Sequence, residues 1–457
     1  MGSVSDPATE PAAPAAPHPP DTRPQRGDEL ELTIDALAYG GRGVARDGGY
    51  VVFVDGGFPG DRVRAVVTKR KRRFAEAQLI ELIEAGPERV PYDGEPCPGA
   101  PWAELAYDRQ LAHKHDQVRD ALERIGHLSD FDLRPIEPAL EQWGYRNKFE
   151  FAFGEQEDGT LALGFHERGS WERVTNSVDC PLASTAIDAA RNRIREWAVE
   201  HDLTAYDRRD RTGILRYLVV REGRRTGQIQ TRLVISAGSS IPAPPVDLLT
   251  ALEGDAGGTE GATELLGTEH LEEELHGLRF RISPWAFFQT NTEMAERLYS
   301  IAADAAELTG SERVYDLFCG IGTIGLTLAD RAKEVWGLEL VPEAVHDAGL
   351  GAELNGITNA KFRAGSARTG LRPLVEEAGT PDLVIVDPPR AGLGAKVVRR
   401  VIECEAARIV YVSCNPTTLA PDAAQFAEAG YRLTRITPVD MFPQTPHIEA
   451  VAVLEHI

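Results

Sequence analysis

After Phe280 the chain alternates short apolar runs with stretches long enough to form helices. Five runs have the length and apolar character of buried strands: 313–317, 334–338, 383–386, 408–412 and 449–454. Neighbouring parallel strands need a crossover between them, and that crossover is usually a helix. The alternation therefore predicts βα units and an α/β fold with a doubly wound, largely parallel, Rossmann-like sheet. Ligands of such sheets bind at the carboxyl ends of the strands.

The 457 residues exceed what one hydrophobic core usually holds, so several domains are expected. Residues 1–27 are rich in Pro, Ala, Ser and Thr and lack the apolar core of a signal peptide, which predicts a disordered tail. Residues 28–86 show β-rich runs between Gly turns, which is typical of a small OB-like barrel.

The part of the chain between the barrel and the α/β domain is less regular. Residues 87–278 mix helical and strand patterns and are predicted to form a central α+β domain. The stretch 254–274 is rich in Gly, Thr and Glu, so we expect an exposed acidic loop there and use it as the domain boundary. Residues 279–457 then form the α/β domain.

Composition limits where the protein works. No stretch approaches the roughly 18 uninterrupted apolar residues that a membrane helix needs, so no membrane partner is expected. The cysteines number five, an odd count without close pairs, which is not typical of a disulfide framework. Reduced thiols, and hence a cytoplasmic location, are expected.

The formal net charge of −22 argues against nucleic-acid binding by the surface as a whole, because phosphate contact needs Lys and Arg side chains. Two local patches oppose that trend. One is the run Lys69–Arg73; the other lies within 208–232 and comprises Arg208, Arg209, Arg211, Arg216, Arg221, Arg224 and Arg225. Charge runs are usually solvated faces. The first patch follows a predicted barrel strand, where such barrels bind nucleic acids, so RNA contact is expected there.

A glycine-rich loop follows the first strand of the α/β domain. Gly320, Gly322 and Gly325 form a G-x-G-x-x-G pattern, which lets the backbone turn sharply beside a cofactor. Glu339 ends the second strand and is placed to accept hydrogen bonds from ribose hydroxyls. The spacing in sequence between the glycine loop and Glu339 fits NAD and S-adenosylmethionine almost equally. Asp316 favours S-adenosylmethionine, because a carboxylate suits its ammonium group and would repel a pyrophosphate.

Two further strands end in residues that could take part in binding or catalysis. Asp387-Pro388-Pro389-Arg390 follows the strand 383–386, and its prolines fix an extended loop. Cys414 follows the strand 408–412, at the same edge of the predicted sheet. A free cysteine is usually buried and inert, but this position makes Cys414 a candidate nucleophile.

The remaining candidates are assigned by position. Cys319 lies inside the glycine loop and Cys404 in a predicted helix, so both are interpreted as packing residues. A proline-rich turn delivers Glu449 to the strand ends. His447 in that turn is a second candidate base, although a loop histidine beside prolines is more often structural.

At these residues the chain closely resembles the RNA uracil-C5 methyltransferases that modify tRNA and ribosomal RNA. The specific matches are FFQTN at 287–291, DLFCGIGTIGL at 316–326, VDPPRAGL at 386–393, SCNPTTLAPD at 413–422 and DMFPQTPHIEAVAVL at 440–454. Weaker matches are LAYDRQL at 105–111 and YRNKFEF at 145–151. Residues 28–86 resemble a TRAM domain, an RNA-binding barrel, in their GGRGVAR turn and PGDRV step.

The resemblance implies a cofactor, a partner and roles for individual residues. S-adenosylmethionine would be held by Gln289, Phe318, Glu339 and Asp387. Cys414 would be the nucleophile and Glu449 the base. Carbon 5 of uracil is a weak nucleophile, so a thiolate first adds to carbon 6, and a carboxylate later removes the carbon 5 proton. The partner would be structured RNA with the target base out of the stack, and no obligatory protein partner is evident.

One departure from the family concerns an iron–sulfur cluster that several members bind through four cysteines. Here Cys97 and Cys180 remain, whereas Pro91 and Ala100 occupy the other two positions. Two thiols cannot hold a four-cysteine cluster. We expect neither a cluster nor another metal.

Four alternatives fit the motifs less well. An NAD-dependent oxidoreductase gives no role to the DPPR, SCNP and PHIEAV segments. An RNA cytosine-C5 methyltransferase would carry its cysteine in a Thr-Cys or Pro-Cys setting, and in an amino-methylating enzyme an aromatic residue would stand at Arg390. A non-catalytic RNA-binding module would be free to lose Cys414 or Glu449, and neither is lost. The RNA stays open between tRNA and rRNA; a TRAM domain is more natural in the ribosomal branch, which favours 23S rRNA.

Overall fold

The computed structural model describes residues 23–94, 97–167, 170, 173–177, 179–245, 248–254, 263–266, 270–284 and 286–457. The chain divides into two compact units. The first comprises residues 1–92 and 102–109, and the second comprises residues 93–101 and 110–457. Residues 1–22 of the predicted tail lie outside the described residues.

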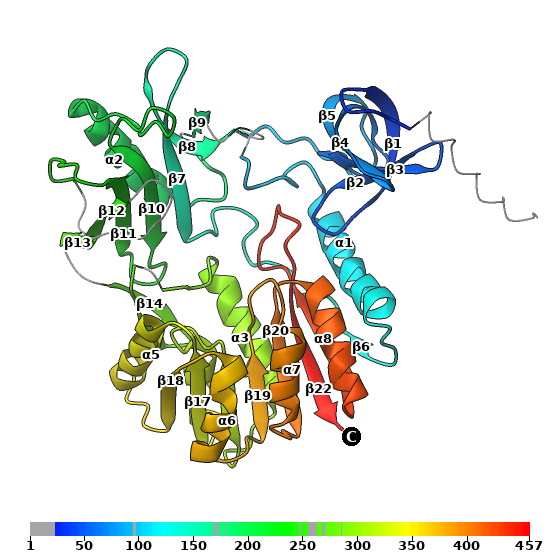
Figure 1. Cartoon of the computed structure of the whole chain (residues 1–457), viewed down its shortest axis with the longest axis vertical. Coiled ribbons are helices and arrows are strands. Elements are labelled where there is room, and N and C mark those ends of the chain that lie inside the picture. The colour runs from blue at the N-terminus through cyan, green and yellow to red at the C-terminus, as the bar shows by residue number, and fades with distance from the viewer. Residues whose placement is uncertain are drawn as a thin grey trace, which may run out of the picture. The chain divides into compact units, whose positions relative to one another are not determined.

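The first unit is built around a closed five-stranded barrel (Figure 1). Its strands, in the order β1-β2-β3-β5-β4, are β1 Glu29–Leu37, β2 Gly43–Asp47, β3 Tyr50–Asp55, β4 Arg62–Arg70 and β5 Phe74–Glu84. Alternate side chains fill the interior, as in β3, where Tyr50, Val52 and Val54 are buried. This is the period-two pattern of a strand with one buried face.

The last residues of the predicted tail differ from the expectation. The Gly27 N–H donates to the Val67 carbonyl at 2.8 Å. The Arg23 guanidinium lies 5.7 Å from the centre of the Tyr50 ring. Residues 23–27 therefore lie against the barrel, because backbone pairing and a cation–π contact hold them there.

The second unit contains a seven-stranded sheet, largely antiparallel, with the order β13-β12-β11-β10-β7-β8-β9. Its elements are β7 Lys148–Glu155, β8 Leu161–His166, β9 Val174–Asn176, α2 Thr185–Glu200, β10 Leu215–Glu222, β11 Ile229–Ser236, β12 Leu248–Gly254 and β13 Thr263–Leu266. The buried Arg191 of α2 donates to the Leu163 carbonyl and to the Asn176 side chain. These bonds fix the helix on the sheet.

The second unit also contains an eight-stranded sheet, with the order β18-β17-β16-β19-β20-β22-β21-β6. Its strands are β6 Asp132–Leu133, β16 Arg313–Leu317, β17 Glu334–Glu339, β18 Ala360–Ala364, β19 Leu383–Val386, β20 Arg408–Ser413, β21 Tyr431–Val439 and β22 Glu449–His456. The five runs predicted as strands are all strands here. The strands from β18 to β20 are parallel, and β22 is antiparallel to both of its neighbours.

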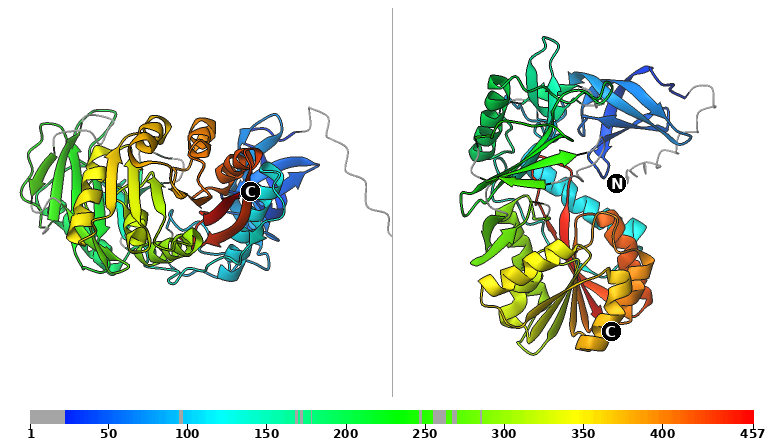
Figure 2. Two further views of the ribbon diagram at one scale, coloured as in Figure 1. Left: turned by 90° about the horizontal axis from the view of Figure 1, so that it is seen from below. Right: turned by 60° about the vertical axis from the view of Figure 1, so that its left-hand side comes forward.

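Helices cover both faces of this sheet (Figure 2). They are α3 Thr292–Ala306, α4 Thr323–Leu328, η3 Ala329–Arg331, α5 Pro342–Leu354, α6 Ala367–Ala378, α7 Gly394–Ile402 and α8 Pro416–Glu428. Successive strand residues enter opposite cores. Ile385 packs in the cluster with α3, whereas Val384 and Val386 pack in the cluster with α6, α7 and α8. A strand buried on both faces is apolar at every position, which explains the continuous runs in the sequence.

Two elements of the predicted central domain, a helix and a short strand, pack with the eight-stranded sheet instead. Helix α1 Tyr107–Asp120 continues as a turn of π-helix, η2 Ala121–Ile125, and its Val118 lies in the core with α8. The short strand β6 pairs with β21. The predicted division at residue 278 therefore separates parts that pack together, because the early segment completes a sheet made mostly of later strands.

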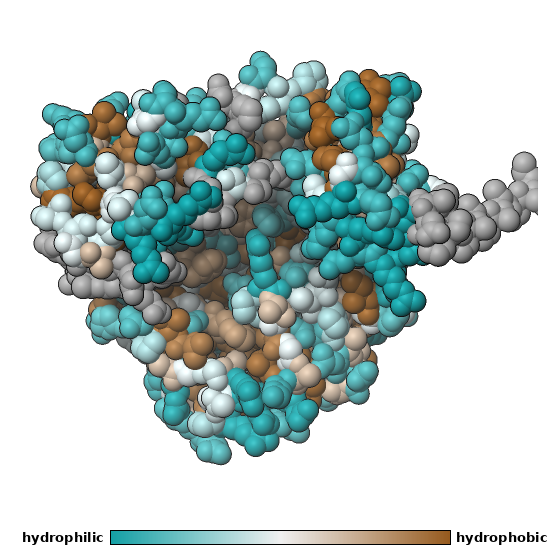
Figure 3. Space-filling model, turned by 45° about the horizontal axis from the view of Figure 1, so that its top comes forward, coloured by the Kyte–Doolittle hydropathy of each residue, from teal (hydrophilic) through white to brown (hydrophobic). Residues whose placement is uncertain are grey.

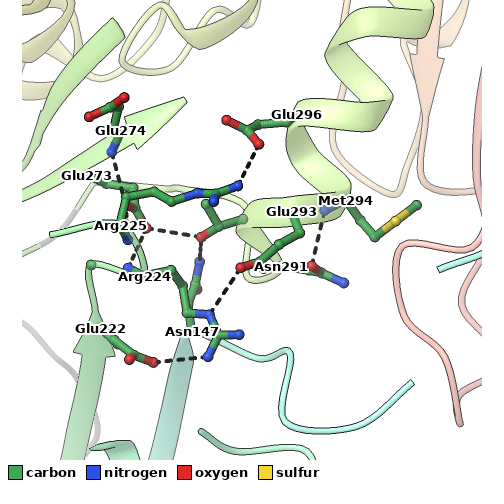
Figure 4. A network of polar contacts seen from close by, with 12 residues as sticks. Asn147, Glu222, Arg224, Arg225, Glu273, Glu274, Asn291, Glu293, Met294 and Glu296 are labelled. Atoms are coloured by element: carbon green, nitrogen blue, oxygen red, sulfur yellow. Dashed lines mark hydrogen bonds and ion pairs between the residues drawn. The ribbon is translucent and has the colours of Figure 1, made fainter. Parts of the chain in front are cut away.

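Of the predicted exposed loop 254–274, residues 255–262 and 267–269 lie outside the described residues, and most of the described remainder forms strands rather than a loop. The hairpin of β14 Leu271–Leu275 and β15 Leu278–Ile282 crosses the predicted boundary. Glu273 is buried, and its carboxylate accepts the N–H groups of Arg224 and Arg225 and the Thr292 hydroxyl (Figure 4). These donors satisfy a carboxylate that composition alone assigns to solvent.

Among the described residues no helix is long and apolar enough to cross a membrane. On the face shown in Figure 3, apolar residues occur in groups among hydrophilic ones.

Lys114 of α1 forms a fully buried ion pair with Asp440, with Nζ and Oδ1 2.5 Å apart. Lys114→Ala leaves the Asp440 carboxylate buried without this cation, so we expect a loss of about 3–5 kcal/mol in the free energy of unfolding of the second unit. Calorimetry of the full chain measures the loss as an earlier unfolding transition. The control Arg119→Ala breaks an exposed pair with Asp116 on the same helix and should cost about 1 kcal/mol or less. Equal shifts for the two variants would contradict the expectation.

Candidate active site

The strand ends that carry the predicted site residues meet at one edge of the eight-stranded sheet. Val386 pairs with both Leu317 and Tyr411, so β16, β19 and β20 end at similar heights. Ser413 at the end of β20 pairs with Ala450 near the start of the antiparallel β22. Residues that follow the parallel strands and residues that begin β22 therefore come together.

The glycine loop has the sharp turn that its sequence predicts. Gly320 and Gly322 have φ angles of 55° and 80°, and α4 begins immediately afterwards. A Cβ atom at Gly322 would lie 2.9 Å from the Phe362 ring, so only glycine fits there. Phe318 also has a positive φ, 64°, an uncommon conformation for an aromatic residue that is typical of functional loops.

Glu339 closes this loop from the end of β17. One carboxylate oxygen accepts the Gly320 N–H at 3.1 Å, and the other accepts the Val341 N–H at 2.9 Å. The next two side chains, Leu340 and Val341, are 67% and 47% exposed. A carboxylate beside exposed apolar side chains fits a ligand that has hydroxyl groups next to a flat apolar ring.

Buried carboxyl groups dominate the electrostatics of the site. Asp316 is fully buried; its Oδ2 accepts the Gly325 N–H at 2.9 Å, and no hydrogen-bond partner of Oδ1 is found among the described residues. Burial raises the pKa of Asp316 and the pKa of Asp387 to about 7. Burial, together with the charge of Asp387, raises the pKa of Glu449 well above its ordinary value. This excess of acidic groups fits a cationic ligand, and the sulfonium and ammonium groups of S-adenosylmethionine are such cations.

Cys414 is half-buried between β20 and α8. Its neighbour Asn415 caps α8 by accepting the Thr417 N–H at 3.0 Å, and its amide donates to the Arg390 carbonyl at 3.0 Å. The cysteine loop is therefore tied to the DPPR loop. Burial, followed by the charges of Glu449 and Asp387, raises the pKa of Cys414 to about 12, whereas Arg390 opposes this rise.

The turn before Glu449 is held from distant parts of the sequence. Gln110 of α1 exchanges two hydrogen bonds with Gln444, at 2.7 and 2.9 Å. The Tyr145 hydroxyl donates to the Pro443 carbonyl at 3.0 Å. Sequence reasoning did not single out these two residues, although they lie within the LAYDRQL and YRNKFEF matches, which were the available signal.

His447 and Gln289 complete the predicted set. The exposed His447 ring lies 3.4 Å from the Arg390 guanidinium. Gln289 is buried just before α3, where its carbonyl accepts the Asn147 side-chain amide at 3.0 Å. The structure thus brings the DPPR, cysteine and glutamate segments to one edge of the sheet, with the glycine loop beside them and Gln289 at the start of a covering helix.

The two basic patches differ in exposure. All five side chains of Lys69–Arg73 are exposed on the barrel, as expected of a solvated face. In the stretch 208–232, Arg216, Arg221 and Arg232 are instead buried, so this stretch is not a continuous surface patch. Arg221, for example, donates to the Ala286 carbonyl at 2.9 Å.

Comparisons with known proteins agree with this architecture. Residues 23–80 match the family model of the TRAM domain, and residues 262–457 match that of tRNA (Uracil-5-)-methyltransferase. An uncharacterized RNA methyltransferase of Halalkalibacterium halodurans is 37% identical, over 94% of this chain and 97% of its own length. One from Caldanaerobacter subterraneus is 36% identical, over 94% and 99%.

A solved structure extends the similarity to the fold. The Pyrococcus abyssi tRNA (uracil-54, C5)-methyltransferase, in complex with S-adenosyl-L-homocysteine, matches with a TM-score of 0.77 and 29% identity, over 93% of this chain and 100% of that one. The match includes both the barrel and the α/β domain that carries the site. The chain belongs to the RNA uracil-C5 methyltransferase family and is an S-adenosylmethionine-dependent enzyme with a TRAM barrel.

Proposed function

We propose that Cys414 adds covalently to carbon 6 of the target uracil and that Glu449 removes the proton from carbon 5. The register of β20 and β22 carries this proposal. Because Ser413 lies opposite Ala450, the next residues toward the site, Cys414 and Glu449, follow side by side. Their electrostatic coupling supports the same placement.

The chemistry needs both groups. Addition of the sulfur to carbon 6 makes carbon 5 an enolate carbon that is able to attack an electrophilic methyl group. After methylation carbon 5 carries both the methyl group and its original proton. A carboxylate with a raised pKa is a strong base once ionised, so Glu449 suits removal of that proton before the Cys414 sulfur leaves.

The cofactor would be held by Gln289, Phe318, Glu339 and Asp387. S-adenosylmethionine, when bound, supplies the methyl group. The free thiol of Cys414, with a pKa near 12, is protonated at neutral pH. A cation beside Asp387 and Glu449 offsets their negative charge and thereby lowers the pKa of the thiol.

For the RNA we propose 23S rRNA. The exposed run Lys69–Arg73 on the TRAM barrel supports a structured substrate that is contacted at a second place, and a TRAM domain is more natural in the ribosomal branch of the family. tRNA is the second candidate, because the similar Pyrococcus enzyme is a tRNA methyltransferase. We further propose that no iron–sulfur cluster is bound, since only two cysteines remain at the cluster positions.

Methyl transfer to unmodified 23S rRNA and tRNA transcripts tests the mechanism and the substrate together. The wild type should form 5-methyluridine, and Cys414→Ala should form none. Glu449→Gln should lower kcat by roughly 10²–10⁴-fold and accumulate a protein–RNA adduct that survives denaturing electrophoresis, because proton removal is blocked after methylation. The matched control Cys404→Ala, which removes a thiol in the core, should keep its activity. An active Cys414→Ala variant would refute the covalent step, and the transcript that is methylated identifies the RNA.

Cofactor binding should release protons near pH 7. Asp316 and Asp387, each with a pKa of about 7, are about half protonated there, and a bound cation favours their ionised forms. Affinity should therefore rise as the pH increases through 7 and level off above it. Isothermal titration in buffers of different ionisation enthalpy measures the released protons. S-adenosylhomocysteine, which lacks the sulfonium charge, should release fewer, as should S-adenosylmethionine with Asp387→Asn; equal release in all three cases would contradict the assignment.

A further inference from the structure

A pocket lies on the seven-stranded sheet and shares no residue with the active site. It has a volume of about 370 Å³, within the range of roughly 300–1,000 Å³ that is usual for small-ligand sites. Strands β7, β8 and β10 and the segment 205–209 surround it. Its lining includes Phe153, His166, Tyr206, Arg208, Arg216 and Tyr217. We propose that this pocket binds one unpaired nucleotide of the RNA substrate; the proposal rests on the RNA substrate proposed above.

The pocket combines aromatic rings with guanidinium groups. The Arg216 guanidinium lies 4.7 Å from the centre of the Tyr206 ring, and the Arg208 guanidinium lies 5.9 Å from that of Tyr217. Arg208 also donates to the Tyr217 hydroxyl. Proteins stack unpaired bases on aromatic rings and on guanidinium planes, so two such pairs in one pocket form a platform for a base.

The charges of the pocket favour the phosphate of the same nucleotide. Three arginines line it, and Arg209 is the third. Of the two lining carboxylates, Asp207 is turned toward its own backbone and accepts the N–H groups of Arg209 and Asp210. Burial and the charge of Arg208 lower the pKa of His166, which keeps its ring neutral near pH 7. Arginines bind phosphate oxygens in a fixed fork geometry.

The proposal is tested by measuring the affinity for RNA of two variants that each lose one positive charge, one inside the pocket and one outside it. The variant Arg208→Gln should weaken binding of the transcript that the enzyme methylates about 5- to 150-fold, the effect expected for one lost base contact. Arg193 is exposed on α2, which packs on the same sheet, and it lies outside the pocket. Arg193→Gln should therefore change the affinity less than twofold. Tyr217→Ala should weaken binding without any change in net charge, and ultraviolet cross-linking should join Tyr206 or Tyr217 to one nucleotide.

Cofactor titration shows whether each variant is folded. Equal weakening by the pocket variants and by Arg193→Gln, or cross-links only outside the pocket, would overturn the proposal. RNA binding is measured without turnover. A wild type that binds RNA but transfers no methyl group would therefore refute the proposed reaction but not the proposal that the pocket binds a nucleotide.

A second inference concerns Cys97 and Cys180, whose Sγ atoms lie 3.0 Å apart although 83 residues separate them in sequence. Cys180 is buried and Cys97 is half-buried. We infer that this pair forms a reversible disulfide when a peroxide is supplied. Hydrogen peroxide oxidises the Cys97 thiolate to a sulfenic acid and releases hydroxide. The Cys180 thiol then attacks the Cys97 sulfur, which forms the S–S bond and releases water.

The surroundings make Cys97 the reactive thiol. The pKa of Cys97 is lowered, mainly by the hydrogen bond from Cys180 and also by the N–H groups of Gly99 and Ala100. Burial of the Cys97 thiol opposes this shift. Burial raises the pKa of Cys414 to about 12, so the proposed nucleophile stays protonated and less reactive. Peroxide should therefore oxidise Cys97 and Cys180 before it oxidises Cys414.

Mass spectrometry of intact and digested protein tests this inference. Anaerobically purified wild type should carry five free thiols and no iron. A low dose of hydrogen peroxide should lower the mass by two hydrogens, link the peptides of Cys97 and Cys180, and be reversed by dithiothreitol. Cys180→Ser should leave a sulfenic acid on Cys97 that a dimedone probe labels, whereas the control Cys404→Ser should still form the disulfide. Bound iron in the purified protein, or oxidation of Cys414 first, would overturn the inference.

Discussion

The direction of one strand determines the chemistry of the site. A parallel strand beside β20 would end, not begin, at the edge where ligands bind. Because β22 runs antiparallel to β20, its first residue, Glu449, lies next to the residue that follows β20. The proposed nucleophile, Cys414, and the proposed base, Glu449, thus reach the same place from strands that are neighbours in the sheet, without any long loop between them.

The turn before Glu449 depends on residues far away in sequence. The ion pair of Lys114 with Asp440 and the hydrogen bonds from Gln110 and Tyr145 span 298 to 334 residues. Each of these polar groups is buried, so each would cost stability without its partner. The carboxylate of Glu449 therefore enters the site on a turn whose backbone is fixed by α1 and by the segment just before β7.

Five strands of the eight-stranded sheet could be predicted from the sequence, whereas β6, β18 and β21 could not, and α1 and the β14–β15 hairpin were assigned to other parts of the chain. Leu383–Val386 was readable because a strand buried on both faces is apolar throughout. The glycine loop and the strand-end position of Cys414 followed from local patterns. Glu273 was assigned to an exposed loop because the donors that satisfy it, on Arg224 and Arg225, are about fifty residues earlier, and composition carries no information on such partners.

The pairing of α1 and β6 with the end of the chain has a consequence for synthesis. Lys114 leaves the ribosome 326 residues before its partner Asp440. At about 5–20 residues per second, the helix waits roughly 15 to 65 seconds before that carboxylate exists. During this interval the side of α1 that is buried in the folded protein, which carries Gln110, Lys114 and Val118, lacks the strands that it packs against. The nascent chain therefore passes through a stage in which aggregation competes with folding.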